Sequence, residues 1–367
     1  MEDEVKDLQF VPIGNKRVKQ KKDVFCKFVA ENQDKEFYVC AHDNPDPDAL
    51  SSAFGMARIL QFLGVEVSLY YCGEISHPQN KAMQNVLGIP IRKWTASTKD
   101  EINTADVIFV FVDCCGRQKN MSIPFEPHIA VDHHKAVAAK NVIFIHEEVG
   151  ACATLITDLM LSIPDEKTET SVLRCFDPNA DDIREIATAL AIGIKTDTID
   201  FTSETTSEDD FKAYKFLSRF VSDDKFSKIV NYKLPEYVYE SEEIAWKNKT
   251  LNGPNLLAGL GFLDVGKSDC IPYLADHLMR LEGIQTVLVY AIVGNTIKAS
   301  LRTISASVDA SALCSYIFGE GNGGGKHGIA GANVHFNVFD ADEMDDDDKT
   351  KLWELTKKTI ERKFFRE

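Results

Sequence analysis

Four stretches of the sequence place acidic or imidazole side chains directly after a run of apolar residues. They are His42 to Asp48, Asp113, Asp132-His133-His134 and Thr196-Asp197-Thr198. Several carboxylates brought to one site would repel one another, and divalent cations would remove that repulsion. A mixture of Asp and His ligands without a thiolate signature favours Mn²⁺ or Mg²⁺ over a structural zinc.

The chemistry that such a constellation supports is phosphoryl transfer to water. Two divalent ions about 4 Å apart, bridged by a carboxylate, activate water near neutral pH and clamp both oxygens of a phosphoryl displacement. The candidate carboxylates are Asp46, Asp48, Asp113 and Asp197. An isolated Asp-His-His triplet would more often be a polar turn, so the prediction depends on all four stretches meeting. It indicates metal-assisted hydrolysis of a phosphoester or a phosphoanhydride.

These side chains need a fold that brings distant segments together, and the alternation of predicted elements provides one. Apolar runs predict strands at 37–41, 65–70, 106–112, 129–131 and 142–145. Helical spacing of apolar residues predicts helices at 49–63, 80–87, 151–161 and 182–195. This alternation predicts an α/β fold, a mostly parallel sheet with helices on both faces. Because ligands bind at the carboxyl ends of such strands, we expect the acidic stretches to converge there.

A second, smaller α/β domain with a mixed sheet is predicted after residue 252. Strands are expected at 256–263, 286–292, 296–301 and 333–339, with a helix at 309–318. The segment 321–331 contains six glycines together with Lys326 and His327. The predicted divisions are a larger domain at 1–235, a linker at 236–252, the smaller domain at 253–340, and an acidic linker with a C-terminal helix at 341–367.

Two charged segments are interpreted as solvated chain. The basic run Lys16 to Lys22 is predicted to be a mobile arm rather than a nucleic-acid contact, with a helix following at 23–32. The acidic run Asp340 to Asp348 is predicted to be a solvated linker rather than a partner site.

Composition limits the function classes. The 367-residue chain has a net charge of −16, which argues against a protein that coats long duplex DNA but permits a short nucleotide bound with metal ions. No apolar run approaches the ~18 residues of a membrane-spanning helix, and we expect no secretory signal. Nine cysteines without a C-x-x-C pair indicate reduced, buried thiols in a cytoplasmic protein.

The motifs resemble those of the DHH phosphoesterase superfamily. Its four metal-binding motifs are matched by His42-x-Asn44-Pro45-Asp46-x-Asp48-Ala49, Asp113, Asp132-His133-His134 and Thr196-Asp197-Thr198. Its DHH-associated substrate domain is matched by Lys298-Ala299-Ser300-Leu301-Arg302 and by Gly323-Gly324-Gly325-Lys326-His327-x-x-Ala330-Gly331-Ala332. The size of the chain is similar to the oligoribonuclease and nanoRNase branch. Lys326 departs from the family, which commonly has glycine just before this histidine.

The resemblance implies a ligand set and catalytic roles. One Mn²⁺ would be held by His42, Asp46 and Asp113. A second would be held by Asp48, Asp113, His133 and Asp197, with Asp113 as the bridge. Asp132 would orient a ligand histidine, and His134 would contact the scissile phosphate.

The resemblance also implies substrate contacts in the second domain. Arg302 and His327 would bind phosphate or a terminal nucleotide, and the backbone of the glycine segment, Gly324 and Gly325 with Lys326, would approach phosphate oxygens closely. Arg117 is left open between a phosphate ligand and a surface cation.

We therefore expect hydrolysis of short linear nucleotides to mononucleotides. Candidates are dinucleotides such as pGpG, nanoRNA and 3′-phosphoadenosine 5′-phosphate. The alternatives are a cyclic dinucleotide phosphodiesterase, a RecJ-type single-strand exonuclease, and a non-catalytic nucleotide-binding module. The expected partner is a short nucleotide substrate, without long duplex DNA or a membrane, and a homodimer is left open.

Overall fold

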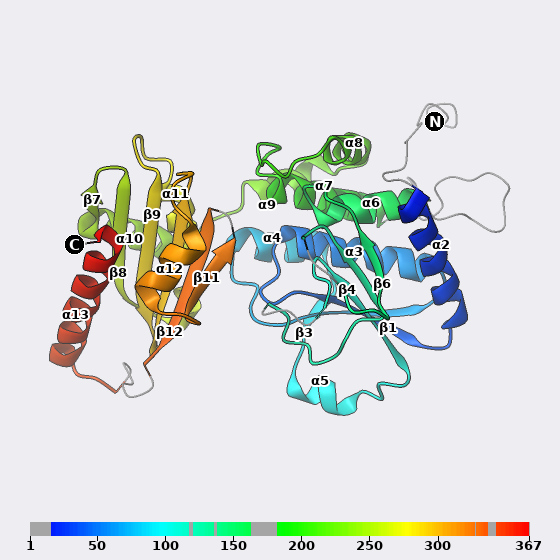
Figure 1. Ribbon diagram of the computed structural model, residues 1–367, viewed down its shortest axis with the longest axis horizontal. Helices are drawn as coiled ribbons and strands as arrows, with labels where there is room; N and C mark the ends of the chain where they lie inside the picture. Colours follow the sequence, from blue (N-terminus) through cyan, green and yellow to red (C-terminus); the bar gives the residue numbers. More distant parts are fainter. Residues whose placement is uncertain are drawn as a thin grey trace. The chain divides into compact units, whose positions relative to one another are not determined.

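The structure, a computed structural model, describes residues 16–116, 120–135, 138–162, 182–326, 328–336 and 343–366. The chain forms two compact units, Met1–Tyr232 and Lys233–Glu367 (Figure 1). Each unit contains a six-stranded sheet covered by helices. The α/β fold predicted from the sequence is confirmed.

The sheet of the first unit is parallel throughout. Its strands are β1 (Glu36–Ala41), β2 (Glu66–Tyr71), β3 (Ile91–Lys93), β4 (Val107–Val112), β5 (Ile129–Asp132) and β6 (Ile143–His146). β4 reads Val-Ile-Phe-Val-Phe-Val, and all six side chains are buried. A continuous apolar run of this kind is typical of a central parallel strand that is covered on both faces.

The strand order places one reversal point at the centre of this sheet. The order is β3-β2-β1-β4-β5-β6, so the chain first moves outward from β1 and then returns to β4 on its other side. Ala41 at the end of β1 lies beside Val112 at the end of β4. Connections leave these two neighbours in opposite directions, and the carboxyl ends of such strands are where ligands bind.

Seven helices of the first unit contribute to one large core together with the sheet (Figure 1). They are α2 (Lys16–Glu31), α3 (Pro47–Phe62), α4 (Pro78–Leu87), α6 (Cys152–Ser162), α7 (Ile183–Asp197), α8 (Glu208–Leu217) and α9 (Asp223–Val230). α3 and α7 approach closely at Gly193, where a Cβ atom would lie 2.2 Å from Ser51 Oγ. Any larger residue at 193 would therefore separate the two helices.

A second cluster of the first unit is mostly aromatic. Tyr38 and Tyr70 lie 4.9 Å apart between ring centroids, Trp94 meets both edge-on, and Phe109 stacks on Phe125. The short helix α5 (Ala96–Glu101) is followed by Ile102, which packs against this cluster. The sheet therefore has apolar side chains packed on both of its faces.

The second unit has a mixed sheet with the order β11-β12-β10-β9-β8-β7. Its strands are β7 (Thr250–Asn252), β8 (Asn255–Leu263), β9 (Thr286–Val293), β10 (Thr296–Thr303), β11 (Gly323–Lys326) and β12 (Ile329–His335). Among the described strands of this second sheet, β8 and β9 pair in parallel and the other neighbours pair antiparallel. One core includes α10 (Glu236–Asn248) and α11 (Cys270–Leu278), and another includes α12 (Ala310–Phe318) and α13 (Asp346–Phe365). The remaining element is the one-turn helix η1 (Val265–Lys267).

Two segments differ from the sequence-based expectation. The predicted linker 236–252 contains α10, because Val238, Ser241 and Ala245 form one buried stripe at helical spacing. In the glycine segment, residues 323–326 and 329–331 lie in β11 and β12, which pair antiparallel. The predicted basic arm is part of α2, which begins at Lys16. No helix among the described residues has the length and apolarity needed to cross a bilayer.

Candidate metal centre

The first group of candidate ligands lies where β1 and β4 end. His42 follows β1 and Asp113 follows β4, and His42 Nε2 lies 3.3 Å from Asp113 Oδ2. Asp46 is the N-cap of α3, where Oδ1 accepts a hydrogen bond from Ala49 N at 2.9 Å. Its Oδ2 lies 3.8 Å from His42 Nε2. The strand register and the helix cap thus bring three donor groups together.

A second group shares Asp113 with the first. His133 Nε2 lies 3.2 Å from Asp197 Oδ2, 3.4 Å from Asp113 Oδ1 and 4.0 Å from Asp48 Oδ2. Asp197 is the last residue of α7, where a helix disfavours negative charge because its carboxyl end is itself negative. Asp113 presents Oδ2 to one group and Oδ1 to the other, as a bridging carboxylate would.

Backbone carbonyl groups fix the orientation of both histidine rings. His42 Nδ1 lies 2.9 Å from Asp43 O, and His133 Nδ1 lies 2.9 Å from Val149 O. A carbonyl oxygen only accepts, so each Nδ1 carries the proton and donates it. Each Nε2 therefore faces carboxylate oxygens, an arrangement found in metal-binding histidines.

Two buried atoms of the centre lack a hydrogen-bond partner among the described residues. They are Asp113 Oδ1 and His133 Nε2, which face each other. Buried polar atoms are almost always satisfied, and a cation would satisfy both of these at once. The oxygen and imidazole donors fit a divalent ion such as Mn²⁺ or Mg²⁺.

In the absence of a cation, protons on the histidines and on Asp48 offset part of the negative charge of the site. Burial acts to lower the pKa of His133, but the carboxylates of Asp113, Asp48 and Asp197 outweigh it and raise that pKa to about 10. The pKa of His42 is also raised, because Asp113 and Asp46 outweigh its burial. Burial and the neighbouring charges of Asp113 and Asp197 raise the pKa of Asp48. The ion-free site therefore retains protons that a cation must displace.

The amino end of α6 holds Asp48 in place. Cys152 N and Ala153 N donate to its two oxygens at 2.6 and 2.8 Å. These are unpaired first-turn amides of the helix, and they favour a carboxylate both by hydrogen bonding and through the helix dipole. Asp48 is completely buried, so this support fixes its position inside the centre.

Asp113 has an unusual backbone conformation. Its φ is +58°, a left-handed value that asparagine, aspartate and glycine adopt more readily than other residues. Its amide donates to Val131 O at 2.9 Å, which ties the end of β4 to β5. The turn directs the carboxylate toward His42 and His133 at a cost of the order of 1 kcal/mol.

Asp132 is expected to orient a ligand histidine. Its Oδ1 accepts from His134, from N at 3.0 Å and Nδ1 at 2.8 Å, and His134 forms a further group of metal-type donors with Asp113 and His133. The ligand candidate His133 is oriented by Val149 O instead. Adjacent residues direct their side chains differently, so one buried carboxylate reaches only His134.

The sequence also did not indicate that Asp210 fixes the backbone next to Val149. Asp210 is fully buried and accepts from Gly150 N at 2.8 Å, and from Ser207 N and Oγ, each at 2.7 Å. Its other oxygen accepts from Thr154 Oγ1 at 2.5 Å. The spacing of Ser207 and Asp210 fits a capping box, a signal for the start of α8. Nothing in that pattern indicates the contact with residue 150.

The predicted substrate residues of the second unit lie on or beside β10 and the glycine hairpin. Arg302 is in β10, directly opposite Ile329. Gly324 and Gly325 pair with Gly331 and Ala330 in the hairpin. A Cβ at Gly325 would lie 2.1 Å from Ile329 O, so only glycine fits there. Arg117 and His327 lie outside the described residues, as does the side chain of Lys326.

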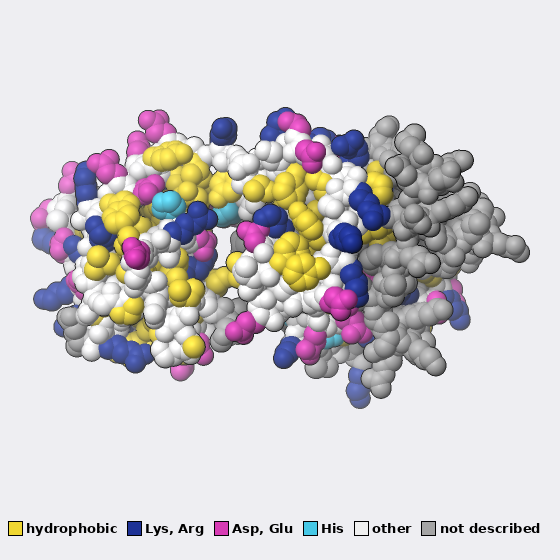
Figure 2. All heavy atoms as spheres, turned by 90° about the horizontal axis from the view of Figure 1, so that it is seen from above, with side chains coloured by type: hydrophobic (Ala, Val, Ile, Leu, Met, Phe, Trp, Pro, Cys, Tyr) yellow, Lys and Arg dark blue, Asp and Glu magenta, His cyan; other side chains and the backbone are white. Residues whose placement is uncertain are grey.

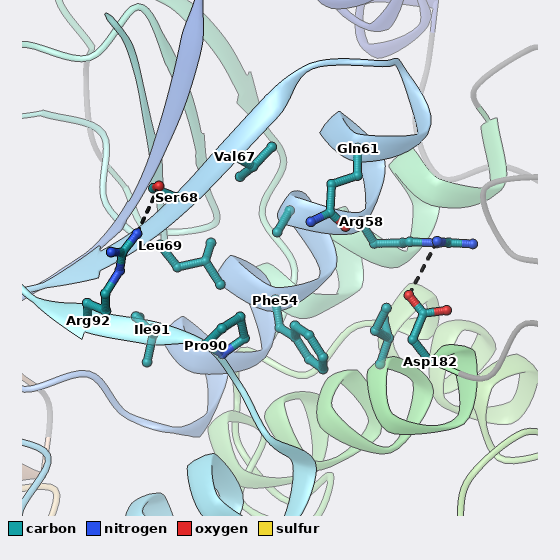
Figure 3. Close-up of a pocket in the computed structure, with 12 residues that line it drawn as sticks. Phe54, Arg58, Gln61, Val67, Ser68, Leu69, Pro90, Ile91, Arg92 and Asp182 are labelled. Atoms are coloured by element: carbon teal, nitrogen blue, oxygen red, sulfur yellow. Dashed lines mark hydrogen bonds and ion pairs between the residues drawn. The ribbon is translucent and has the colours of Figure 1, made fainter.

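A separate cavity of about 380 Å³ lies in the first unit between α3, β2 and β3 (Figure 3). Its walls are mainly apolar and include Phe54 and Leu69. Arg58 points to Asp182 at one end, at 3.3 Å, and Arg92 donates to Ser68 at 3.1 Å. None of the candidate metal ligands lines it.

Comparison with known proteins gives matches at the level of family and of fold. Residues 36–194 match the family described as "DHH family, N-terminal domain". An uncharacterized protein of Methanocaldococcus jannaschii, MJ1633, is 29% identical over 336 residues, which are 91% of this chain. The chain spans 64% of that relative's length.

Comparison with solved structures gives one alignment that supports the fold, the first of the two that follow. An exopolyphosphatase-related protein from Bacteroides fragilis aligns with a TM-score of 0.59 and 17% identity, over 94% of this chain and 97% of that one. RecJ from Thermus thermophilus, solved with Mn²⁺, aligns with a TM-score of 0.46 and 14% identity, over 98% of this chain and 56% of its own. The family match over residues 36–194 agrees with the meeting of the candidate ligands at the ends of β1, β4, β5 and α7, and this part of the chain is similar to the N-terminal domain of the DHH family.

Proposed function

We propose that the chain hydrolyses phosphodiester bonds of short linear nucleotides, such as pGpG, nanoRNA or 3′-phosphoadenosine 5′-phosphate, and releases mononucleotides with the help of two Mn²⁺. The observation that supports this most is the position of Asp113. Its two oxygens face two adjoining groups of metal-type ligands, one through His42 and one through His133. A carboxylate shared by two cations is a recurring feature of phosphoryl-transfer sites.

The residues divide into two ligand sets. His42 and Asp46 would hold one cation, Asp48, His133 and Asp197 the other, and Asp113 would be common to both. Bound there, the ions would lower the pKa of a water ligand and draw charge from a phosphoryl oxygen. The chain itself fixes the donors through two backbone carbonyls and the amino end of α6.

His134 is assigned to the scissile phosphate. Asp132 accepts its Nδ1 proton, so the ring is held in one orientation, and Nε2 is the atom that we assign to a phosphate oxygen. The side chain is 31% exposed, in contrast to the buried Asp132 beside it. A substrate can therefore reach His134 while the hydrogen bond from His134 to Asp132 stays in place.

The second unit, taken by itself, has a polar strip that is suited to a phosphorylated ligand. Lys298, Ser300 and Arg302 alternate along β10 and so share one face of the sheet. β11 is an edge strand, which leaves some of its backbone N–H groups unpaired by the ladder. A guanidinium and free amides are suited to phosphate oxygens, which supports a phosphorylated ligand.

The charge distribution favours a short ligand over a long one. On the face drawn in Figure 2, basic side chains are interspersed with acidic ones among the described residues. The net charge of the whole chain is −16. Long nucleic acids are usually bound along a continuous basic surface, whereas a short nucleotide needs only local positive groups.

A substrate panel tests the proposal. Chelator-stripped protein is incubated with Mn²⁺ and pNpN dinucleotides, longer oligomers, cyclic dinucleotides, pyrophosphate and 3′-phosphoadenosine 5′-phosphate, and kcat/KM is compared. We expect linear short nucleotides to give the highest values and no turnover in the presence of excess chelator. Preferred cleavage of a cyclic dinucleotide or pyrophosphate would contradict the substrate assignment, and turnover with chelator would contradict the metal assignment.

A further inference from the structure

The guanidinium of Arg302 is held on two sides by its own unit. Nε and Nη2 donate to the two carboxylate oxygens of Asp276, at 2.5 and 3.2 Å. Nη1 donates to Ser300 Oγ at 2.8 Å and to Leu301 O at 3.1 Å. Asp276 comes from α11, and the other two acceptors come from β10 itself. The second N–H of Nη2, on the side away from Asp276, has no acceptor among the described residues.

The two partners of this ion pair differ in exposure. The side chain of Arg302 is 14% exposed, and that of Asp276 is 56% exposed. A surface ion pair at such a position adds little to folding stability. Its main consequence is geometric, because a bidentate carboxylate fixes the plane of a guanidinium whose long side chain would otherwise adopt many rotamers.

We propose that Asp276 is a positioning residue for phosphate binding by Arg302. It binds the Nε–Nη2 edge and so directs the second N–H of Nη2, together with the hydroxyl of Ser300, toward a phosphate oxygen of the ligand. This inference rests on the proposed function, since it assigns Arg302 to a nucleotide phosphate. The ligand class is a nucleoside monophosphate or the terminal phosphate of a short oligonucleotide.

Neighbouring residues agree with a nucleotide at this place. Lys298 lies on the same face of β10, where its Nζ approaches Ser268 Oγ at 3.4 Å, and adds positive charge. Ile329, directly across the ladder from Arg302, is 47% exposed and gives an apolar surface beside the guanidinium. Phosphate-binding and apolar groups side by side match a ligand with a charged end and a flat base.

The alternative is that Asp276 competes with phosphate for Arg302. Competition and positioning predict opposite changes in phosphate affinity for the Asp276→Asn substitution. This substitution removes the charge and one acceptor without changing the size of the side chain. Competition predicts tighter binding of phosphate in the variant. Positioning predicts weaker binding, because the guanidinium then samples other rotamers.

The experiment measures binding of adenosine 5′-monophosphate to the full-length chain by calorimetry, with excess chelator so that the centre of the first unit holds no cation. We expect Asp276→Asn to weaken binding roughly tenfold, about the effect of one charge-assisted hydrogen bond. Glu282→Gln, which removes the same charge from an exposed position of the same unit, should leave it unchanged. In an Arg302→Lys background, Asp276→Asn should have no further effect, because lysine has no second edge to orient.

Three results would overturn the inference: unchanged or tighter binding by Asp276→Asn, the same weakening in the Arg302→Lys background, or no binding by the unsubstituted chain. Thermal unfolding of each variant shows whether the fold is retained. Failure here is distinguishable from failure of the proposed function, because Mn²⁺-dependent hydrolysis is measured separately. In the active protein, Asp276→Asn should raise KM and leave kcat nearly constant.

Discussion

His42 Nε2 lies 3.3 Å from Asp113 Oδ2, and the two residues follow the two strands between which the strand order reverses. Their contact is a consequence of the register that places Ala41 beside Val112. His42 and Asp113 are separated by 70 intervening residues, and parallel pairing of β1 with β4 brings them together without a long loop. Asp113 is the residue on which both ligand groups depend.

Replacing Asp113 by asparagine should reduce the Mn²⁺-dependent rate by roughly a thousandfold or more, since both groups lose their shared carboxylate. Asparagine is chosen because it tolerates the φ of +58° that alanine would adopt only with strain. The measurement is the initial rate on a dinucleotide, with circular dichroism to check folding. Asp106→Asn, at an exposed position just before the same strand, is the matched control and should retain full activity. A variant at 113 that kept a tenth of the rate would remove Asp113 from the bridging role.

Metal binding should release protons, and apparent affinity should rise with pH. His133 has a pKa of about 10 in the ion-free fold, above its usual 6.5. A raised pKa stabilises the ion-free fold fully below 6.5, and this contribution is lost as the pH rises toward 10. The cation therefore competes with a proton throughout that range. Its apparent affinity is lowest at the acid end, where the proton is most fully bound. Calorimetry of Mn²⁺ binding from about pH 6 to about pH 8, in buffers of different ionisation enthalpy, measures the protons released. Binding that is independent of both buffer and pH would contradict the protonation of this site.

Asp210→Asn should lower both folding stability and metal affinity. The carboxylate accepts from Gly150 N, Thr154 Oγ1 and Ser207, and an amide leaves buried donors unpaired at a cost of about 2–3 kcal/mol. Because Gly150 follows the carbonyl that orients His133, Mn²⁺ affinity should fall as well. Denaturant unfolding and Mn²⁺ titration are the two measurements. Glu208→Gln, an exposed acid of the same helix, should change stability by less than about 0.5 kcal/mol. Lower stability with unchanged affinity would separate Asp210 from the centre.

Lys22→Met should destabilise the first unit by about 3–5 kcal/mol, because it removes the buried ammonium group that forms an ion pair with the buried carboxylate of Asp158. The side chains are 9% and 2% exposed, and Lys22 also donates to Ser162 Oγ at 2.9 Å. The double variant Lys22→Met with Asp158→Leu should recover most of the loss, since no charge is then left unpaired. Lys27→Met, exposed on the same helix, serves as the control in urea unfolding. Equal stability of all variants would show that this pair is dispensable.

The strands and the order of the motifs could be predicted from the sequence because their signals are local. β4 is an uninterrupted apolar run that ends at Asp113, and β5 ends at Asp132, so the carboxyl ends of the strands were visible as changes from apolar to acidic residues. The convergence of these ends follows from a general property of parallel sheets. The first sheet and the meeting of the four motifs were therefore within reach of the sequence.

What could not be predicted depends on contacts that leave no local pattern. Val149 contributes a backbone carbonyl, and Cys152 and Ala153 contribute amides, which every residue except proline possesses. The helix α10 was missed because its charged outer face outweighs the small residues Ser241 and Ala245 of its buried stripe. Spacing also cannot tell which of two adjacent rings turns toward Asp132, and the structure shows that it is His134.

The central prediction is that a pair of divalent cations is held by His42, Asp46, Asp48, Asp113, His133 and Asp197. Anomalous diffraction from crystals grown with Mn²⁺ tests this claim directly. We predict two anomalous peaks on either side of Asp113, one bonded to His42 Nε2 and the other to His133 Nε2. Crystals of the full-length chain in saturating Mn²⁺ with no peak within bonding distance of these nitrogen atoms would contradict it.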